Sequence, residues 1–242
     1  MAGSGIDEVL PASARLRPHT ADTSMLLRRR LLAELMPSIL HELSQPLTCV
    51  MLQHAVCRRA MPSDTASADI ALRLAERDAR RASSIIETMN LLSSDESEPV
   101  AETDLNTLVS RAAELLKRHL YDRHCTIEYH MASLPDARLS PTTAMEAILR
   151  AIVVGAQSDA KTASQMSVVT KLDREGQYVQ LIFRAVDEAG ISKFSTVTSC
   201  NNYAPITNRI RSEGGQIGLC GGELIIEFPV AGGPKSRDLG GA

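Results

Sequence analysis

Aromatic side chains are scarce in this sequence, and their scarcity excludes one class of protein. Phe, Trp and Tyr make up 3% of the 242 residues, and Trp is absent. Proteins that bind single strands of nucleic acid stack the bases on aromatic rings, so a binding platform of that kind is excluded. The net charge of −3 also lacks the basic excess of nucleic-acid binders. We therefore expect no nucleic-acid partner.

Long apolar runs are missing as well. No stretch reaches the ~18 apolar residues of a membrane-spanning helix, and the opening MAGSGIDEVLPASARLRPHT has no apolar core like that of a signal peptide. The five cysteines are scattered and form no Cys-x-x-Cys pair, which is typical of reduced and mostly buried thiols. These absences predict a cytoplasmic protein without a membrane partner.

The amino-terminal part of the chain is predicted to be a disordered tail followed by a helical hairpin. Residues 1–23 are rich in Ala, Ser, Gly and Pro, which disfavours a packed core. The hairpin is expected over residues 24–95, with a turn at MPSD (Met61–Asp64). In both helices, apolar or small residues recur at spacings of three and four: Ala33, Met36, Leu40, Leu43, Leu47, Val50, His54 and Cys57 in the first, and Leu72, Ala75, Ala79, Ala82, Ile86 and Met89 in the second.

This heptad spacing leaves an apolar face on each helix that a lone hairpin cannot cover. Pairing with a second copy into a four-helix bundle buries both faces, and we expect a homodimer for this reason. The alternative is that the helices pack on the rest of the same chain. His54 occupies a heptad position and is expected to be a core residue.

After an acidic linker, SSDESEPVAET, the pattern changes to alternating helices and strands over residues 104–230. Helices are predicted in DLNTLVSRAAELLKRHL, PTTAMEAILRAIVVGAQ and APITNRIRSEGG, and strands in CTIEYHM, MSVVTKL, YVQLIFRAV and a closing hairpin, QIGLCGGELIIEFPV. This mixture indicates a two-layer α/β sandwich. Residues 231–242 are expected to form a flexible tail.

One stretch of the first helix, HELSQPL, has the residue types of phosphoryl chemistry. His41 lies one position off the heptad pattern, where its imidazole can meet solvent and act as a nucleophile. Gln45 and Ser44 lie four and three residues later, so both can share the His41 face. Glu42 points about 100° away and is expected to act on groups of a docked partner. A zinc site of the His-Glu-x-x-His type is excluded, because Gln45 stands where the second histidine would be.

HELSQPL resembles the phospho-acceptor H-box of bacterial sensor histidine kinases, in the subfamily that reads H-E-[IL]-x-Q-P-L. RRASSII (residues 80–86) is similar to the second dimerisation helix of that family. DLNTLVSRAAELL and SLPDARLSPTTAMEAIL resemble the start of the ATP-binding domain, and SEGGQI resembles the H-G-G-x-I before its closing hairpin. The resemblance covers residues 25–230 in the family's order.

The resemblance implies a fold and a set of site residues. The fold is an α-helical hairpin forming a dimeric four-helix bundle, followed by a degenerate α/β two-layer sandwich of the histidine-kinase ATPase (Bergerat-like) type. His41 becomes the phosphorylated residue, Glu42 the assisting acid or base, and Gln45 the residue that governs dephosphorylation. Ser44 and Leu47 are expected to contact docked receiver domains.

The sequence departs from the family at the nucleotide site. Ala151 and Gly155 stand where the family's N-box has two asparagines, and neither offers the oxygen ligand that a magnesium ion requires. The G1 box becomes VDEAGI (residues 186–191), and SCNNYAP (residues 199–205) replaces the glycine-rich lid, whose backbone amides close around a triphosphate. These departures argue against an ATP-driven kinase.

We therefore predict a histidine-containing phosphotransferase that relays phosphoryl groups between response-regulator receiver domains through His41. It needs no cofactor of its own, because the partner receiver supplies the Mg²⁺. The length of 242 residues leaves no room for a sensor domain ahead of the hairpin, which fits a relay component, although the chain could also be a fragment of a longer sensor. Two alternatives are a divergent sensor kinase that still binds ATP and a non-enzymatic dimeric scaffold that binds receivers.

Overall fold

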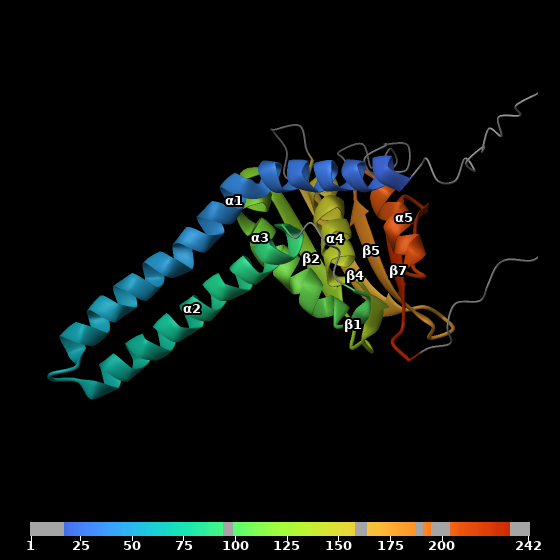
Figure 1. Cartoon of the computed structure of the whole chain (residues 1–242). Helices are drawn as coiled ribbons and strands as arrows, with labels where there is room; N and C mark the ends of the chain where they lie inside the picture. The colour runs from blue at the N-terminus through green and yellow to red at the C-terminus, as the bar shows by residue number, and fades with distance from the viewer. Residues whose placement is uncertain (1–16, 94–98, 158–163, 187–190, 195–203, 233–242) are drawn as a thin grey trace, which may run out of the picture.

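The computed structural model describes residues 17–93, 99–157, 164–186, 191–194 and 204–232. A long helical hairpin projects from an α/β domain, and the first half of its first helix runs across the helices of that domain (Figure 1). The hairpin consists of α1 (Arg17–Ala60) and α2 (Thr65–Ser93). Asp64 ends the turn between them and accepts hydrogen bonds from the amide and hydroxyl of Ser67, as expected for a helix cap.

The first helix begins earlier than the sequence indicated. The prediction of a disordered tail over residues 1–23 is wrong from Arg17 onward, where α1 starts. The composition of this stretch is poor in apolar residues, but it continues a helix whose later turns pack on the α/β domain. The rest of the predicted tail, residues 1–16, lies outside the described residues, as do residues 233–242 of the predicted flexible tail.

The α/β domain contains a mixed five-stranded sheet in the order β2-β4-β5-β7-β6. Its strands are β2 (Cys125–Met131), β4 (Ser164–Leu172), β5 (Tyr178–Ala185), β6 (Gln216–Cys220) and β7 (Glu223–Pro229). β2 and β4 pair in parallel, and all the other pairs are antiparallel. The helices α3 (Leu105–Asp122), α4 (Pro141–Gly155) and α5 (Ala204–Ser212) cover one face of the sheet (Figure 1). The predicted two-layer α/β architecture is confirmed, together with the predicted positions of these strands and helices.

Local signals in the sequence explain why these elements form where they do. The side chain of Asp104 accepts from the amide of Asn106 at the start of α3, and Pro141 opens α4 after the cap Ser140. Gly176 adopts a positive φ of 69° in the turn between β4 and β5, a conformation that glycine reaches without strain. The antiparallel pair of β1 (Ala101–Thr103) with β3 (Ala137–Leu139) was not predicted.

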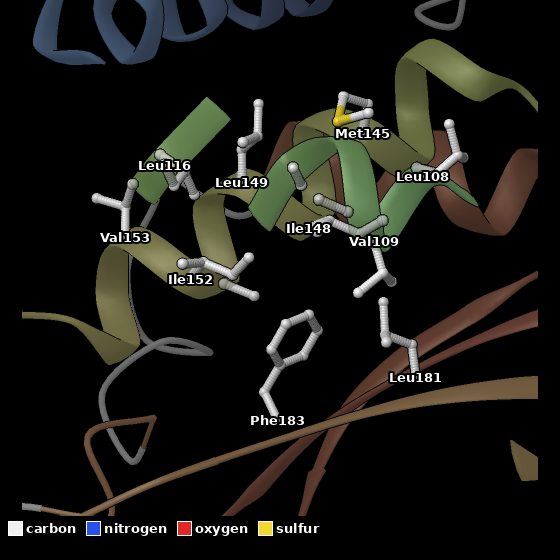
Figure 2. Packing of buried hydrophobic residues seen from close by; sticks show 14 of the residues in the cluster. Leu108, Val109, Leu116, Met145, Ile148, Leu149, Ile152, Val153, Leu181 and Phe183 are labelled. Carbon is white, nitrogen blue, oxygen red and sulfur yellow. The ribbon is translucent and has the colours of Figure 1, made fainter. Parts of the chain in front are cut away.

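The hydrophobic core lies between the sheet and its helices and extends into the hairpin. Figure 2 shows α3, α4 and β5 meeting through side chains such as Val109, Ile148 and Phe183. Leu35 and Ile39 of α1 belong to the same cluster, and each is no more than 1% exposed. The first half of α1 is therefore part of the α/β domain's core as well as of the hairpin.

The two helices of the hairpin face each other through some of the predicted heptad residues and through charged residues that the pattern did not select. Cys57 of α1 packs with Ala68 and Ala71 of α2 near the tip, and closer to the domain the buried positions include Glu42 and Asp78. Of the predicted heptad residues, Cys57 and Ala82 are buried and Leu40, Leu47, Leu72 and Ile86 are exposed, and His54 is exposed rather than a core residue. The periodicity of apolar residues missed part of the inner face because that part contains charged side chains.

Candidate functional site around His41

His41 is exposed on α1, and Gln45 lies beside it one turn later, as the spacing predicted. The two Nε2 atoms are 3.3 Å apart. The Gln45 amide nitrogen donates to Nε2 in the tautomer that carries the ring proton on Nδ1. His41 thus presents an exposed imidazole, the type of side chain that serves as a nucleophile in phosphoryl transfer.

Glu42 follows His41 in the chain, but its carboxylate lies inside the protein. The residue is 2% exposed and accepts a hydrogen bond of 2.8 Å from Arg81 Nη2 of α2. Nε of the same Arg81 donates to Glu114 Oε1 of α3 at 2.6 Å. The expectation that Glu42 faces a docked partner is wrong in this conformation, because Arg81 holds the carboxylate inward. Its role as an acid or base stays a prediction.

Of the two residues predicted to contact a receiver, Ser44 is exposed on the His41 side of α1 and Leu47 is turned away from that side. The hydroxyl of Ser44 donates to the carbonyl of Leu40 at 2.7 Å, a bond within the helix. Leu47 lies six residues after His41, which places it about 120° around the helix. It is 47% exposed and faces solvent on the side of the predicted heptad residues. The docking role of both residues stays a prediction.

An exposed apolar stripe runs along the hairpin, formed by Leu40, Leu47, Met51, Leu72 and Ile86, each between 46% and 74% exposed. Successive residues of a helix are about 100° apart around its axis. On this geometry the stripe on α1 lies about 100° around the helix from the face that packs on α2. The stripe on α2 is turned from its own packing face by a similar angle, in the same rotational direction. Because α1 and α2 are antiparallel, both halves of the stripe fall on the same side of the hairpin. His41 is turned the other way and lies on the opposite side, toward α3.

Helix α3 is tied to the hairpin by ion pairs at three levels. Arg123, just after α3, pairs with Glu34 of α1 at 3.2 Å. Glu114 pairs with Arg81, and Arg111 lies 3.5 Å from Glu87 near the end of α2. The α/β domain is therefore fixed beside the segment of α1 that carries His41.

Ala151 and Gly155, which the resemblance placed at the N-box asparagines, are buried in the core of the α/β domain. Ala151 has no exposed surface, and Gly155 is also buried. A Cβ atom on Gly155 would lie 2.4 Å from Met166 Sδ and 3.2 Å from Phe194 Cζ. No side chain larger than hydrogen fits at residue 155 unless its neighbours move. Most of the altered G1 box and lid, residues 187–190 and 199–203, lies outside the described residues.

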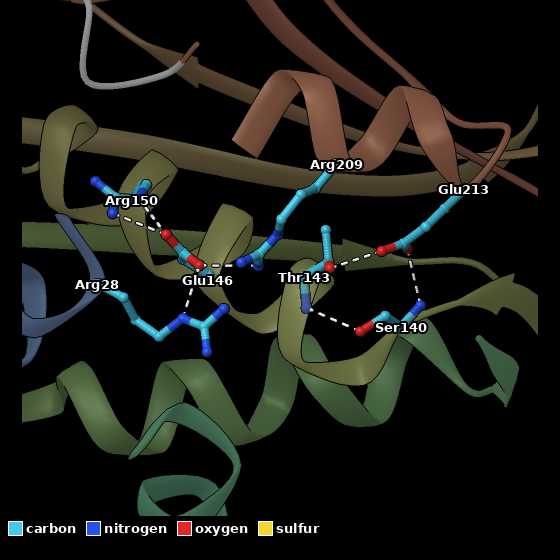
Figure 3. A network of polar contacts seen from close by, with 7 residues as sticks. All are labelled: Arg28, Ser140, Thr143, Glu146, Arg150, Arg209 and Glu213. Carbon is cyan, nitrogen blue, oxygen red and sulfur yellow. Dashed lines mark hydrogen bonds and ion pairs between the residues drawn. The ribbon is translucent and has the colours of Figure 1, made fainter. Parts of the chain in front are cut away.

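A buried carboxylate on α4 that no sequence pattern indicated joins three arginines from three helices (Figure 3). Glu146 accepts from Arg28 of α1 at 3.1 Å, from Arg150 one turn later at 2.8 Å, and from Arg209 of α5 at 3.0 Å. Burial lowers the pKa of the Arg209 guanidinium, and the charge of Glu146 opposes this shift. Arg28 and Glu146 are 118 residues apart, so only the fold brings them together.

A surface pocket lies between the end of α2, β1 and the start of α3, and neither His41 nor Gln45 lines it. Three of its charged groups are engaged, since Asp104 caps α3 and Arg111 pairs with Glu87. Within the described ranges, no three His, Cys, Asp or Glu side chains gather as a metal site would require. In that same part of the chain, no helix has the length and apolar character needed to cross a membrane.

Comparisons with known proteins find histidine kinases among the solved structures. The histidine kinase AdeS of Acinetobacter baumannii is 12% identical with a TM-score of 0.44, over 78% of this chain and 96% of that one. The nucleotide-free catalytic domain of histidine kinase ThkA is 14% identical with a TM-score of 0.43, over 57% of this chain and all of that one. The structure of ThkA in complex with the response regulator protein TrrA is 14% identical with a TM-score of 0.43, over 93% of this chain and 69% of that one. The sequence matches no protein-family model and no curated protein.

Proposed function

We propose that this chain is a histidine-containing phosphotransferase that relays phosphoryl groups between receiver domains through His41, without ATP-dependent kinase activity of its own. The observation that carries the proposal is the exposed imidazole of His41 with Gln45 Nε2 3.3 Å from its own Nε2. This arrangement suits nucleophilic attack, and it is found on an exposed helix rather than in a closed pocket. An open site of this kind fits a reaction partner that is itself a folded domain.

The transfer step requires little from the chain beyond a positioned nucleophile. The Nε2 lone pair of His41 attacks the phosphorus of an aspartyl phosphate on the donor receiver. The N–P bond forms as the P–O bond breaks, and the aspartate leaves with the electron pair as a carboxylate. The Nδ1 proton is then released to solvent, and the second receiver's aspartate reverses the steps. Magnesium bound by each receiver stabilises the charge on the phosphoryl oxygens.

The packing around Gly155 supports the absence of kinase activity in this proposal. The family's second N-box asparagine would need space that Met166 Sδ and Phe194 occupy. Ala151, at the first asparagine position, is enclosed by the same core. A magnesium–nucleotide complex therefore finds no oxygen ligand at either position. We expect no measurable Mg-ATP binding at millimolar concentration by calorimetry, and a micromolar dissociation constant would favour a divergent kinase instead.

The apolar stripe supports a homodimer. Met51 is 74% exposed and Leu40 is 55% exposed, and both belong to one continuous row on a single side of the hairpin. A second copy of the hairpin presents the same row, so the two can pack as a four-helix bundle with the α/β domains on the outside. His41 then stays accessible, because it lies on the side of the hairpin that faces away from the stripe.

A second exposed apolar group supports docking of a receiver beside His41. Leu52, Val56 and Ile70 are 50–60% exposed and lie on the His41 side of the hairpin by helical geometry. Leu52 is eleven residues after His41, about 16 Å along the helix axis. An apolar surface on a receiver that is placed here leaves its phosphorylated aspartate close to the histidine. On this proposal Leu52, rather than Leu47, contacts the partner.

The function is tested by mixing the purified protein with each receiver domain of its source genome, phosphorylated beforehand with acetyl phosphate. At least one receiver is expected to pass its phosphoryl group to wild type and none to H41A. Incubation with radiolabelled ATP serves as the second arm and is expected to label neither protein. Transfer to H41A would place the site elsewhere, and no transfer to wild type from any receiver would favour the scaffold alternative.

A further inference from the structure

The segment of α1 that carries His41 depends on contacts outside the helix for its position. Pro37 and Pro46 both lie inside α1, on either side of His41. Each lacks an amide proton, so the carbonyls of residues 33 and 42 lose the hydrogen bonds that a regular helix would give them. Helices bend most readily at such positions, and α1 changes direction where it leaves the α/β domain (Figure 1).

Arg81 supplies a polar contact to this segment. It comes from α2, and its guanidinium bonds Glu42 with one nitrogen and Glu114 of the α/β domain with another, at 2.8 Å and 2.6 Å. The side chain of Glu42 is 3% exposed, whereas those of Arg81 and Glu114 are 28% and 34% exposed. A carboxylate that is buried to this degree needs a paired cation. While Arg81 is in place, its contact with Glu42 therefore opposes rotation of the α1 segment that carries Glu42 and His41.

On the basis of the function proposed above, we propose that Arg81 is a positioning residue for phosphoryl transfer. It fixes the direction of His41 by holding the neighbouring Glu42 against Glu114 of the α/β domain. This assigns the α/β domain a part in the reaction without nucleotide: through Glu114 and Arg81 it sets the angle at which His41 meets the phosphorus atom. Arg81 itself touches neither the receiver nor the reacting atoms in this account.

The adjacent Arg80 provides a matched control. It lies on the same helix and also makes an ion pair, with Glu76 at 2.5 Å, but its side chain is 79% exposed and the pair is confined to α2. R80M therefore removes the same charge and the same number of atoms as R81M, without releasing Glu42. A difference between the two variants reports the contact to the His41 segment rather than the loss of an arginine.

The test measures the rate of phosphoryl transfer from one phosphorylated receiver as its concentration is varied. The receiver chosen is the one that transfers fastest to wild type. R81M is expected to lower the maximum rate about 10²-fold, the usual scale for a misplacement of about 1 Å, while the half-saturating receiver concentration is unchanged. E114Q, which leaves the Arg81–Glu42 pair intact, is expected to lower the maximum rate by a smaller factor, and R80M is expected to leave both quantities unchanged.

A double-mutant cycle with E42Q shows whether Arg81 acts through Glu42. If it does, the double variant E42Q/R81M transfers no more slowly than the slower single variant. Multiplied effects, or a raised half-saturating concentration with an unchanged maximum rate, would contradict the proposal and point to a contact with the receiver. If R81M does not fold, as judged by circular dichroism, E114Q carries the test, and a wild-type maximum rate in E114Q overturns the proposal. Absence of transfer to wild type would instead refute the proposed function.

Discussion

Gly155 permits a sharp test of the proposal that the α/β domain has no room for a nucleotide-binding side chain at this position. Glycine at a helical position is less favourable than alanine by about 0.5–1 kcal/mol, so G155A should stabilise the protein if the site has room. The structure predicts the opposite, that G155A destabilises the protein. The new Cβ would lie 2.4 Å from Met166 Sδ, 3.2 Å from Phe194 Cζ and 3.4 Å from Ala185 Cβ. Carbon-centred contacts are normally ~3.5–4.0 Å, so Met166 must move by about 1 Å within a closed core.

Insertion of one methyl group into a well-packed core costs about 1–3 kcal/mol, which exceeds the gain from helix propensity. We expect G155A to be less stable than wild type by about 1–2 kcal/mol. For a chain of this length that corresponds to a fall in melting temperature of about 2–8 °C, measured by circular dichroism or calorimetry. G155N should be less stable still and should not gain Mg-ATP binding.

Gly218 in β6 is the matched control for this measurement. Its φ is not in the left-handed region, and a Cβ added there would meet no atom within 4 Å. G218A should therefore melt at the wild-type temperature or slightly above it. If G155A also melts at or above the wild-type temperature, residue 155 has room for a side chain, and the packing argument against nucleotide binding is refuted.

Five further outcomes follow from contacts described above. E146A should cost about 3–5 kcal/mol in urea unfolding, because three arginines lose the carboxylate they share. H41A should keep the wild-type melting temperature, since an exposed residue contributes little to packing. Q45A should leave the rate of phosphoryl transfer to His41 unchanged and slow the loss of phosphate to water. L47D should shift the protein from dimer to monomer in sedimentation, because a charge would enter the bundle. Burial lowers the pKa of His119 to about 4, so protonation of this imidazole favours the unfolded chain. The free energy of unfolding should be at its full value above pH ~6.5 and should fall by about 3 kcal/mol toward pH ~4. H119L should remove this pH dependence.

The elements of the α/β domain could be predicted because each carries its own local signals. Asp104 and Pro141 mark helix starts, and Gly176 marks a turn between two alternating strands. The pairing of β1 with β3 could not be predicted, because three residues are too few to show an alternation of apolar and polar side chains. His41 and Gln45 were found as a pair because both lie on one turn of one helix.

The surroundings of Glu42 were beyond the reach of the sequence. Its partner Arg81 is 39 residues away, and Glu114 is a further 33 residues beyond Arg81. A charged residue on the inner face of a helical hairpin also contradicts the heptad rule, which assigns that face to apolar side chains. The rule identified a real apolar stripe, but the stripe lies on the outside of the chain, and only the fold shows which face is which.

The first half of α1 prevents the α/β domain from being separated from the hairpin as an independent fragment. Leu35 and Ile39 complete the core of the α/β domain, and Arg28 reaches Glu146 inside it. A fragment that begins after the linker would expose this apolar surface and leave Glu146 without one of its cations. We expect such a fragment to aggregate, whereas the intact chain should unfold in a single cooperative transition with no stable intermediate. Hairpin and α/β domain are two regions of one folding unit, and neither can be exchanged between proteins as a separate module.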